Sequence, residues 1–396
     1  MEMPKLLFLI FVSFFLFSGC GNSLESESSS KDQIVRINLD HSSASKLSEY
    51  FSTISYTLIE NDKTIPLVEP YQTVVTKNSF FVQDYFNSYI HEFNRKGNHT
   101  KLYKATGQGP KEYQQLDHFQ VLGDTLFILD RSLRKILGYN SYQDAIYEKF
   151  IPVNASIFYK QGNAILYFMN NVADNSDYNF LLYQNDTLVQ ESIKIKSGFE
   201  KFQHASKSGL SSDFNSGFIF PVPFSQDVVF FNKDLRFNKK INFDFGSYSI
   251  QELDFLRLHS LSREEYQDFI KENYLVENIS SFTKLGHYYF MSIYQTNKSL
   301  HFIFLDEKMN VKGQVNNFEN DLDDMRIRNI PWTVSDENLV FKINSVDFYN
   351  DYVEKFSGKK VEILPGNVHE FFQNNQEKLK DDQTVLVSLK LRDDLK

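Results

Sequence analysis

Cys20 is the residue whose side chain offers the clearest chemistry, because it is the only thiol among 396 residues. It follows Leu6–Phe17, a run with a single polar residue, and Lys5 precedes that run. This length is typical of the apolar region of a secretory signal peptide and is too short to cross a bilayer as a helix. The small residues Ser18 and Gly19 separate the run from the thiol. The arrangement predicts an exported protein with a nucleophilic thiol at the end of its signal segment.

The stretch Leu16–Cys20 (LFSGC) resembles the lipobox of bacterial lipoproteins. The resemblance implies that residues 1–19 are a lipoprotein signal peptide, that Cys20 is diacylated, and that its new amine is acylated, for instance with palmitate. Several acyl chains would hold the protein stably on a membrane, where a single chain binds only weakly. We therefore expect a lipid-anchored protein of the cell envelope, at the periplasmic or the surface-exposed face of the outer membrane. The alternatives are an ordinary cleaved signal with a chance cysteine and an uncut N-terminal anchor.

Residues 20–32 are polar and rich in serine, so they cannot bury a core and are expected to form a flexible tether. Glu25 and Glu27 resemble the acidic export signals of surface lipoproteins in Bacteroidota. No cysteine other than Cys20 is present, so no disulfide can form within the chain. A domain of residues 33–396 is long enough to fold on its apolar core alone.

The nine histidines give no metal-binding pattern, because none occurs in a close pair and no His-Glu-x-x-His sequence is present. The acidic runs Glu319–Asp324 and Asp174–Asp177 lack the glycine and the final glutamate of a calcium-binding loop. We interpret both runs as solvated turns, and we expect no metal and no cofactor. A zinc site assembled from distant segments stays open as an alternative.

The sequence contains no motif for a catalytic nucleophile or a phosphate loop, and no catalytic residue is predicted. It has no Gly-x-Ser-x-Gly elbow, although a Ser-His-Asp set could assemble in space. Gly107-x-Gly109 lies between expected strands and is followed by Pro110, which has no amide donor, so it does not suit a phosphate. We expect a turn there, fixed by Glu112 and Tyr113.

Trp332 is the only tryptophan, and it lies near Arg326, Arg328 and Pro331. An aromatic face beside arginines suits the recognition of a carbohydrate or a peptide. Trp332, Arg326 and Arg328 are therefore the candidate ligand-binding residues. The alternative is a tryptophan that packs inside the fold without touching a ligand.

The composition is that of a globular chain rich in strands. It includes 39 phenylalanines and 22 tyrosines, which favour β-structure. With 51 acidic and 42 basic residues, the net charge of −9 argues against a nucleic-acid partner. Glycine and proline are not enriched, which distinguishes the chain from disordered sequences.

An internal repeat indicates the architecture. The sequence FVQD at 81–84 is echoed 46 positions later by FILD at 127–130, and each belongs to a unit of strands separated by turns. Weaker echoes follow, and about six units of about 40–50 residues fit between Thr64 and Phe356. Four short strands in each unit predict an all-β fold, a six-bladed β-propeller. A β-sandwich and a solenoid of similar strand spacing are the alternatives.

Two segments depart from the strand pattern and predict helical insertions. Residues 249–274 contain two capping boxes and apolar residues at helical spacing, and residues 366–380 have a similar apolar stripe. Strands are expected near both ends of the domain, at 34–38 and 384–391. A terminal strand that completes the closing blade would join the ring and remove its free edges.

Several motifs point to a known family. The motif GQGPKEY at 107–113 lies between the first two units, Lys46–Glu60 has the character of a lead-in strand, and the acidic turn Glu319–Asp324 comes late. Together they resemble the six-bladed β-propeller lipoproteins of Bacteroidota, which are distantly similar to NHL-repeat propellers. That family commonly has glycines where this chain has Asp324 and Met325. The resemblance implies a propeller over nearly the whole mature chain and no established biochemical activity.

These observations favour a binding module that is anchored to a membrane. We expect one face of its propeller to bind a glycan, a peptide or an envelope protein, without catalysis. The predicted anchor, the tether and the missing catalytic motif favour this function. The alternative is a hydrolase or a lyase with its site in the central channel of the ring. Carboxylates or histidines that converge in the channel would favour the enzyme.

Overall fold

The computed structural model describes residues 33–395 apart from residues 63, 197, 200–216, 252–257, 259, 297, 328–329 and 336. The predicted signal peptide and the predicted tether, including Cys20, therefore lie outside the described residues. Within the described part of the chain, no helix is long and apolar enough to cross a membrane.

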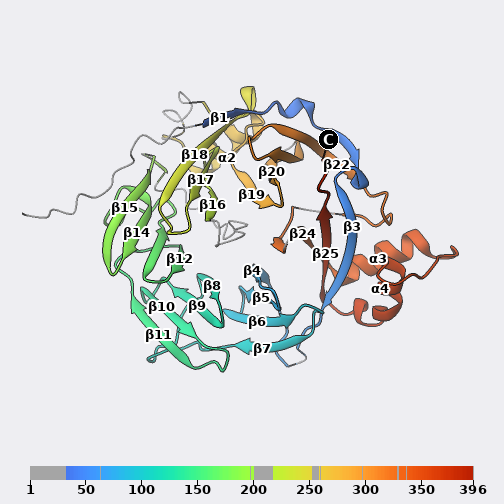
Figure 1. Ribbon diagram of the computed structural model, residues 1–396, viewed down its shortest axis with the longest axis horizontal. Helices are drawn as coiled ribbons and strands as arrows, with labels where there is room; N and C mark the ends of the chain where they lie inside the picture. The colour runs from blue at the N-terminus through green and yellow to red at the C-terminus, as the bar shows by residue number, and fades with distance from the viewer. Residues whose placement is uncertain are drawn as a thin grey trace, which may run out of the picture.

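Six sheets of four or five strands surround a central axis and form a ring (Figure 1). This arrangement confirms the predicted all-β, six-bladed β-propeller. In the first three blades, each strand pairs with its neighbour in sequence. The strands of these blades are β4 (Pro70–Val75), β5 (Ser79–Asp84), β6 (Tyr89–Asn94), β7 (His99–Tyr103), β8 (His118–Leu122), β9 (Thr125–Asp130), β10 (Lys135–Tyr139), β11 (Ala145–Phe150), β12 (Ile157–Gln161), β13 (Ala164–Phe168), β14 (Tyr178–Gln184) and β15 (Thr187–Lys194).

The predicted repeat is present in the first two blades. Asp84 ends β5 and Asp130 ends β9, so the two aspartates occupy equivalent places. Both are fully buried. The backbone N–H of Val68 donates to Asp84 at 3.1 Å, and that of Gln114 donates to Asp130 at 2.6 Å. Each carboxylate therefore links the second strand of its blade to the connection that leads into the same blade.

The connection between the first two blades contains the predicted turn. Glu112 accepts the backbone N–H of Gly109 at 2.8 Å. A Cβ added at Gly107 would collide with this carboxylate, so a side chain there would displace Glu112 from its bond to Gly109. Tyr113 is fully buried and donates its hydroxyl to the carbonyl of Ser88 at 2.8 Å. The loop is therefore a structural joint between blades.

The fourth and fifth blades differ from the others because the N-terminal segment adds a strand to each. β1 (Gln33–Arg36) pairs in parallel with β18 (Phe237–Asp244), and β2 (Ser43–Lys46) pairs in parallel with β22 (Val311–Glu319). These additions cover two outer strand edges (Figure 1). The other elements here are η1 (Leu39–His41), η2 (Leu47–Glu49), β16 (Phe218–Pro221), β17 (Asp227–Phe231), β19 (Ile279–Leu285), β20 (Tyr288–Gln295) and β21 (Ser299–Asp306).

The sixth blade closes the ring with strands from both ends of the chain. β25 (Thr384–Leu391) pairs antiparallel with β3 (Phe51–Ile59) along its whole length. A hydrogen bond joins the sixth blade to the first, because Lys342 Nζ donates to the carbonyl of Pro70 at 2.9 Å. The terminal strand predicted at 384–391 therefore closes the ring together with β3. The remaining strands of the blade are β23 (Thr333–Ser335) and β24 (Asn338–Asn344).

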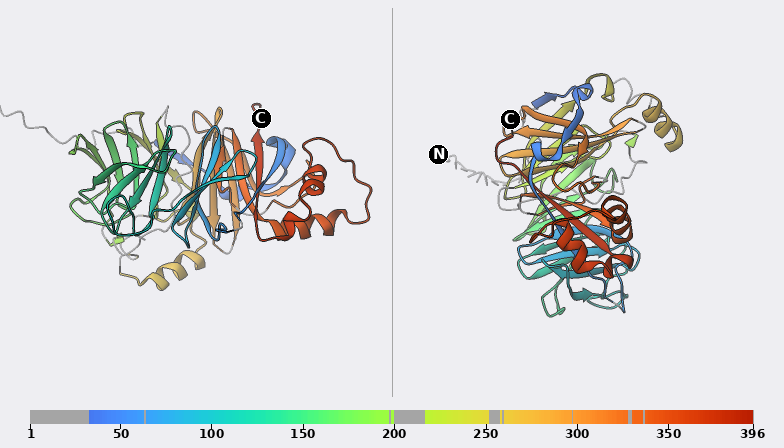
Figure 2. Two further views of the ribbon diagram at one scale, coloured as in Figure 1. Left: turned by 90° about the horizontal axis from the view of Figure 1, so that it is seen from below. Right: turned by 90° about the vertical axis from the view of Figure 1, so that its right-hand side faces the viewer.

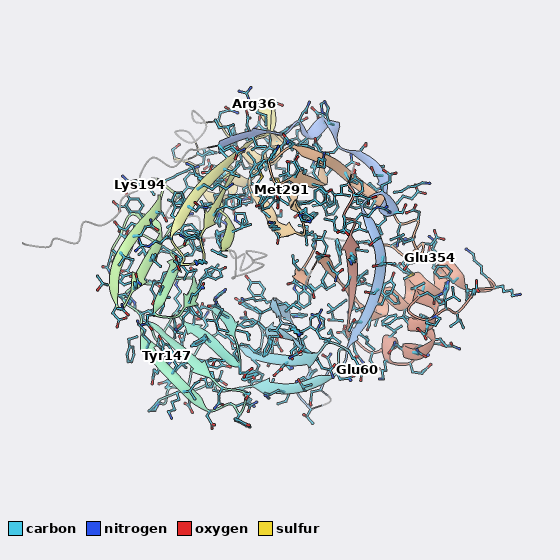
Figure 3. The ribbon with its side chains drawn as sticks, viewed as in Figure 1. Arg36, Glu60, Tyr147, Lys194, Met291 and Glu354 are labelled. Carbon is cyan, nitrogen blue, oxygen red and sulfur yellow. The ribbon has the colours of Figure 1, made fainter. Side chains whose placement is uncertain are left out.

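The apolar core lies between the blades. Each of the six interfaces between neighbouring blades has its own cluster of buried apolar side chains (Figure 3). Between the third and fourth blades, for example, the rings of Tyr159 and Phe218 have centroids 3.8 Å apart. The abundant phenylalanine and tyrosine side chains thus hold sheet against sheet around the ring.

Helix α2 (Arg263–Glu272) lies within the segment 249–274 that was expected to be helical. It begins with a capping box, in which Ser262 accepts the N–H of Glu265 and the Glu265 carboxylate accepts the N–H of Ser262. This pairing satisfies two donors at the start of the helix. The helix follows β18 and the short η4 (Gly246–Tyr248).

Helices α3 (Ser345–Phe356) and α4 (Val368–Asn375) lie between β24 and β25, with η5 (Lys378–Lys380) after them. α4 falls within the segment 366–380, whereas α3 was not predicted from the sequence. α3 forms because Asn344 accepts the N–H of Val346 at 2.9 Å and thereby caps the helix. α2 projects from one face of the ring (Figure 2), whereas α3 and α4 lie outside the ring beside the sixth blade (Figure 1).

Candidate functional site

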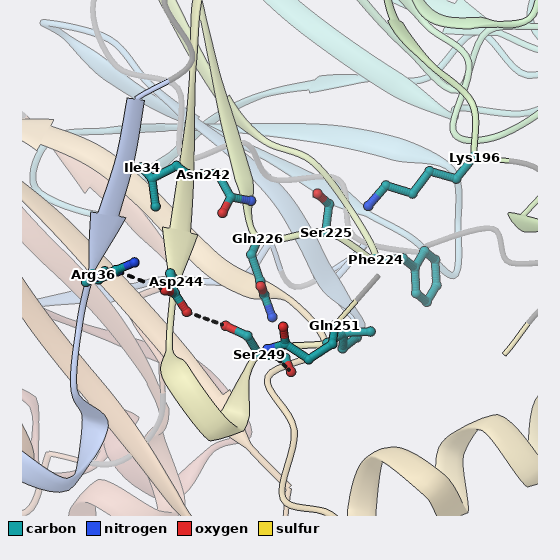
Figure 4. Close-up of a pocket in the computed structure, with 11 residues that line it drawn as sticks. Ile34, Arg36, Lys196, Phe224, Ser225, Gln226, Asn242, Asp244, Ser249 and Gln251 are labelled. Carbon is teal, nitrogen blue, oxygen red and sulfur yellow. Dashed lines mark hydrogen bonds and ion pairs between the residues drawn. The ribbon is translucent and has the colours of Figure 1, made fainter. Parts of the chain in front are cut away.

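A cavity of about 220 Å³ opens beside the fourth blade, next to the segment that leads to α2 (Figure 4). It is formed by β1, β18, the β16–β17 connection, the residues after η4, and one lysine beyond β15. A narrow extension toward the third blade shares three of its lining residues. We name the cavity and its extension the groove. The main cavity is lined by Ile34, Arg36, Lys196, Phe224, Ser225, Gln226, Asn242, Asp244, Ser249, Ile250 and Gln251.

Arg36 lies at one end of the groove, where β1 pairs with β18. Arg36 and Asp244 are opposite each other in the parallel ladder, and Arg36 Nε lies 3.3 Å from Asp244 Oδ2. The backbone N–H of Gly246 donates to the other oxygen of Asp244 at 2.9 Å, which fixes the carboxylate. The Arg36 side chain is 86% exposed, and this ion pair is its one polar contact within the described residues.

Phe224 forms the wall of the groove nearest to α2. Its φ of 54° is unusual for a residue with a large side chain. Its N–H donates to Asn278 Oδ1 at 2.5 Å, and its ring meets Tyr266 of α2 edge-on, with centroids 6.3 Å apart. The helix therefore supports this wall of the groove.

Two amide side chains in the middle of the groove are fixed by the protein. Gln226 is buried and donates its amide to the carbonyl of Val276 at 3.3 Å. Asn242 donates its amide to Asp227 at 2.8 Å. Each bond sets the orientation of its amide group, so the polar atoms that face the groove are held in place before any ligand binds.

Lys196 lies across the groove from Arg36 (Figure 4). Much of its side chain is exposed, but the protein around its ammonium group removes water, and this desolvation lowers the pKa of Lys196. The charge of Asp227 opposes the shift, and that of Lys240 adds to it. The main cavity has two cations, Arg36 and Lys196, and one carboxylate, Asp244. The groove is therefore a cationic site on a chain whose net charge is −9.

The innermost described strands of the six blades carry no carboxylate. β4, β8, β12, β16, β19 and β23 contain neither Asp nor Glu, and apart from tyrosines their titratable residues are His118, Lys160 and Lys284. His118 is buried against the rings of Phe158 and Tyr159. On these described strands, the structure places no group of carboxylates or histidines of the kind that a channel enzyme would use.

Residues 23–342 match the model of the DUF5128 family, which is described as a 6-bladed beta-propeller. The chain belongs to this family. The match and the ring of six sheets confirm the predicted propeller family. Among curated proteins, no relative matches the sequence.

Solved structures are similar to this DUF5128 propeller at low sequence identity. A Bacteroides fragilis protein named as exported is 15% identical, with a TM-score of 0.67 over 91% of this chain and 99% of its own. A DUF4221 member from Bacteroides vulgatus is 10% identical, with a TM-score of 0.48 over 86% of this chain and 97% of its own. A catalytically inactive virginiamycin B lyase from Staphylococcus aureus, with quinupristin, is 9% identical, with a TM-score of 0.41 over 85% of this chain and 100% of its own. The first likeness shows a common fold and nothing about the ligand.

Trp332 of the DUF5128 propeller lies between the sixth and first blades. It is half-buried, and its Nε1 donates to the carbonyl of Tyr71 at 3.2 Å. Lys342 Nζ lies 5.0 Å from the centroid of its ring. These contacts are those of a packed tryptophan that joins two blades, which was the alternative to a ligand-binding role.

Arg326 faces α3, where the carboxylates of Asp351 and Glu354 each lie 3.5 Å from its guanidinium group. Arg328 and Cys20 lie outside the described residues. The described contacts therefore give Arg326 and Trp332 different neighbours. Ligand binding by Trp332, Arg326 and Arg328 stays a prediction, as does lipidation of Cys20.

Two buried histidines have contrasting surroundings. His301 lies with Nδ1 2.8 Å from the Ser42 hydroxyl and Nε2 2.8 Å from the Ser299 hydroxyl. His91 has no hydrogen-bond partner on either ring nitrogen among the described residues. Burial lowers the pKa of each histidine to about 4. The described part of the chain holds no group of three or more His, Cys, Asp or Glu side chains that could bind a metal.

Sequence reasoning did not identify the groove. The residues of its main cavity come from five short segments spread between positions 34 and 251, and none of these segments forms a recognisable motif. The strand predicted at 34–38 was the one relevant signal. Its pairing with β18, which brings Arg36 to Asp244, is a contact between residues more than two hundred positions apart.

Proposed function

We propose that the protein is a cell-envelope lipoprotein whose propeller binds a polar ligand, such as a glycan or a peptide, in the groove and without catalysis. The observation that carries the binding role is the groove itself. It is a preformed hollow with fixed polar groups and an exposed arginine, and convergent polar groups of this kind orient a ligand and give a site its specificity.

The fixed side chains of the groove support binding. Gln226 and Asn242 are already held by the protein, so little side-chain freedom is lost when a ligand arrives. The carboxylates of Asp244 and Asp227 are engaged as acceptors, the first with Arg36 and the second with Asn242. The described charges of the groove therefore favour recognition over acid–base chemistry.

A variant that fills the groove tests this role. Ile34 lines the cavity and is 65% exposed, so Ile34→Trp should block the site without disturbing the core. Ile146→Trp is the matched control, because Ile146 is 58% exposed and lies on β11 of the second blade. Calorimetric titration with glycan fragments and short peptides should show binding to the wild type and to Ile146→Trp only. Equal binding by both variants, or no ligand across broad panels, would contradict the proposal.

The proposed anchor rests on Cys20 and the lipobox-like sequence before it. It is tested by expression of the full chain and of Cys20→Ser in a bacterium that acylates lipoproteins. The wild type should incorporate an alkyne analogue of palmitate and sediment with outer membranes. Cys20→Ser should lose the label and leave the membrane fraction. A Cys20→Ser protein that keeps the label would refute lipidation at this residue.

A further inference from the structure

The guanidinium of Arg36 lies at one end of the groove (Figure 4) and, among the described residues, contacts the protein through Nε only. Asp244 holds its Nε at 3.3 Å, and Gly246 and Ser249 hold Asp244 in turn at 2.9 and 3.4 Å. Among the described residues, no acceptor contacts the two terminal nitrogens of Arg36. A planar guanidinium binds a carboxylate through two parallel hydrogen bonds. This end of the groove therefore suits a ligand carboxylate.

The middle of the groove offers hydrogen-bond acceptors instead. Gln226 and Asn242 each use an amide N–H in a bond to the protein, to Val276 and to Asp227 respectively. Their side-chain carbonyl oxygens make no hydrogen bond with the described residues. A carbonyl oxygen accepts from a donor such as a hydroxyl group. The ligand should therefore carry hydrogen-bond donors, such as hydroxyl groups, beside its carboxylate.

The size of the cavity limits what can enter. Its volume of about 220 Å³ is below the range of about 300–1,000 Å³ for drug-sized ligands. One small unit therefore fits, such as the end unit of a longer chain. Lys196, across the main cavity from Arg36, provides a second cation, whereas the extension toward the third blade holds only about 20 Å³ and is too small for a second unit.

We infer that the groove binds an acidic saccharide unit, with the sugar carboxylate on Arg36 and sugar hydroxyl groups on Gln226 and Asn242. This inference rests on the proposed function, because it names the ligand class of the same groove. An acidic peptide shares the contact with Arg36, and its backbone N–H groups are also donors. A saccharide unit instead places several hydroxyl donors around one small ring, which suits a cavity of about 220 Å³ better.

Calorimetric titration of the purified chain with trigalacturonate, its methyl ester and triglutamate tests the inference. The ester keeps the ring hydroxyls and removes the charge, so the acid should bind at least about tenfold more tightly. Equal affinity for the acid and the ester would overturn the inference and leave the proposed polar-ligand site in place. Tighter binding of triglutamate, or no binding of trigalacturonate, would also overturn it. Failure of the proposed function is read separately, from the Ile34→Trp comparison.

Arg36→Gln separates the guanidinium from the rest of the groove. It should weaken trigalacturonate binding by about tenfold and remove most of the difference between acid and ester. Arg134→Gln is the matched control, because Arg134 is also exposed and ion-paired, at 47% side-chain exposure, but lies before β10 of the second blade and contacts Asp174. It should bind as the wild type does. The reverse result, with a loss only in Arg134→Gln, would overturn the inference.

Discussion

The first blade and the groove beside the fourth blade both contain an aspartate at the end of a strand, but the two carboxylates have opposite surroundings. Asp84 is fully buried, and it accepts the backbone N–H groups of Val68 at 3.1 Å and Glu69 at 3.2 Å, among others. Asp244 has a side chain that is 33% exposed, and its partner Arg36 is almost wholly in solvent.

The difference shows how one residue type serves two purposes in this ring. A carboxylate surrounded by backbone donors holds a blade together, and its acceptor capacity is used inside the fold. A carboxylate that holds an exposed arginine leaves the arginine able to bind something else. The following predictions test this contrast with the two aspartates and with Arg36, and extend it to a buried histidine of the first blade and one of the fifth, beginning with the largest expected effect of a single residue.

The largest effect is expected from Asp84→Ala. The substitution leaves several backbone N–H groups buried without an acceptor, so the free energy of unfolding should fall by about 4 kcal/mol. Asp244→Ala is the control and should cost less than about 1 kcal/mol, because its ion pair is exposed. Urea unfolding followed by tryptophan fluorescence measures both. Similar losses for the two variants would remove the contrast.

The next largest loss of stability from a single residue is expected in a pH titration. The pKa of His91 in the first blade and of His301 in the fifth blade is lowered to about 4 by burial. In the unfolded chain each titrates near about 6.5. Between these values the unfolded chain binds more protons, so stability falls as the pH falls from about 6.5 to 4, by about 3 kcal/mol for each histidine.

Urea unfolding over this pH interval measures the loss, and His91→Leu is the informative variant. It removes one of the two lowered pKa values, so it should lose less stability between about pH 6.5 and 4 than the wild type does. An unchanged pH dependence in His91→Leu would show that His91 titrates normally in the folded protein.

The two histidines should differ when each is replaced by leucine at neutral pH. His301 bonds to Ser42 in the N-terminal segment that also supplies Arg36, and to Ser299. His301→Leu should therefore cost about 2 kcal/mol. His91 has no hydrogen-bond partner among the described residues, so His91→Leu should change stability by less than about 1 kcal/mol. Thermal or urea unfolding measures both losses. A larger loss for His91→Leu than for His301→Leu would contradict this prediction.

The smallest effect on stability is expected from Arg36→Gln. Its side chain is exposed and its ion pair is in contact with solvent, so the free energy of unfolding should change by less than about 0.5 kcal/mol. A larger loss would mean that Arg36 holds β1 on the fourth blade. Binding losses in this variant would then reflect structure as well as recognition.

Local features of the sequence were sufficient to predict the fold. The aspartates at 84 and 130 and the turn at 107–113 lie in segments whose structure depends on near neighbours, and the strand at 384–391 was recognisable from its own composition although its partner β3 is distant. Strand alternation, turn residues and a repeated unit carry that information along the chain. α3 was missed because its apolar residues directly follow a strand and its cap is a single asparagine.

The sequence by itself determined that the chain is a six-bladed propeller, and it marked Cys20 as the expected anchor. Only the tertiary structure decided that Trp332 packs between two blades and that a cationic groove lies beside the fourth. The physical reason is that parallel pairing of β1 with β18 joins distant segments. Such pairing leaves no periodic signal in either strand, because a single arginine and a single aspartate become neighbours only after the ring has formed.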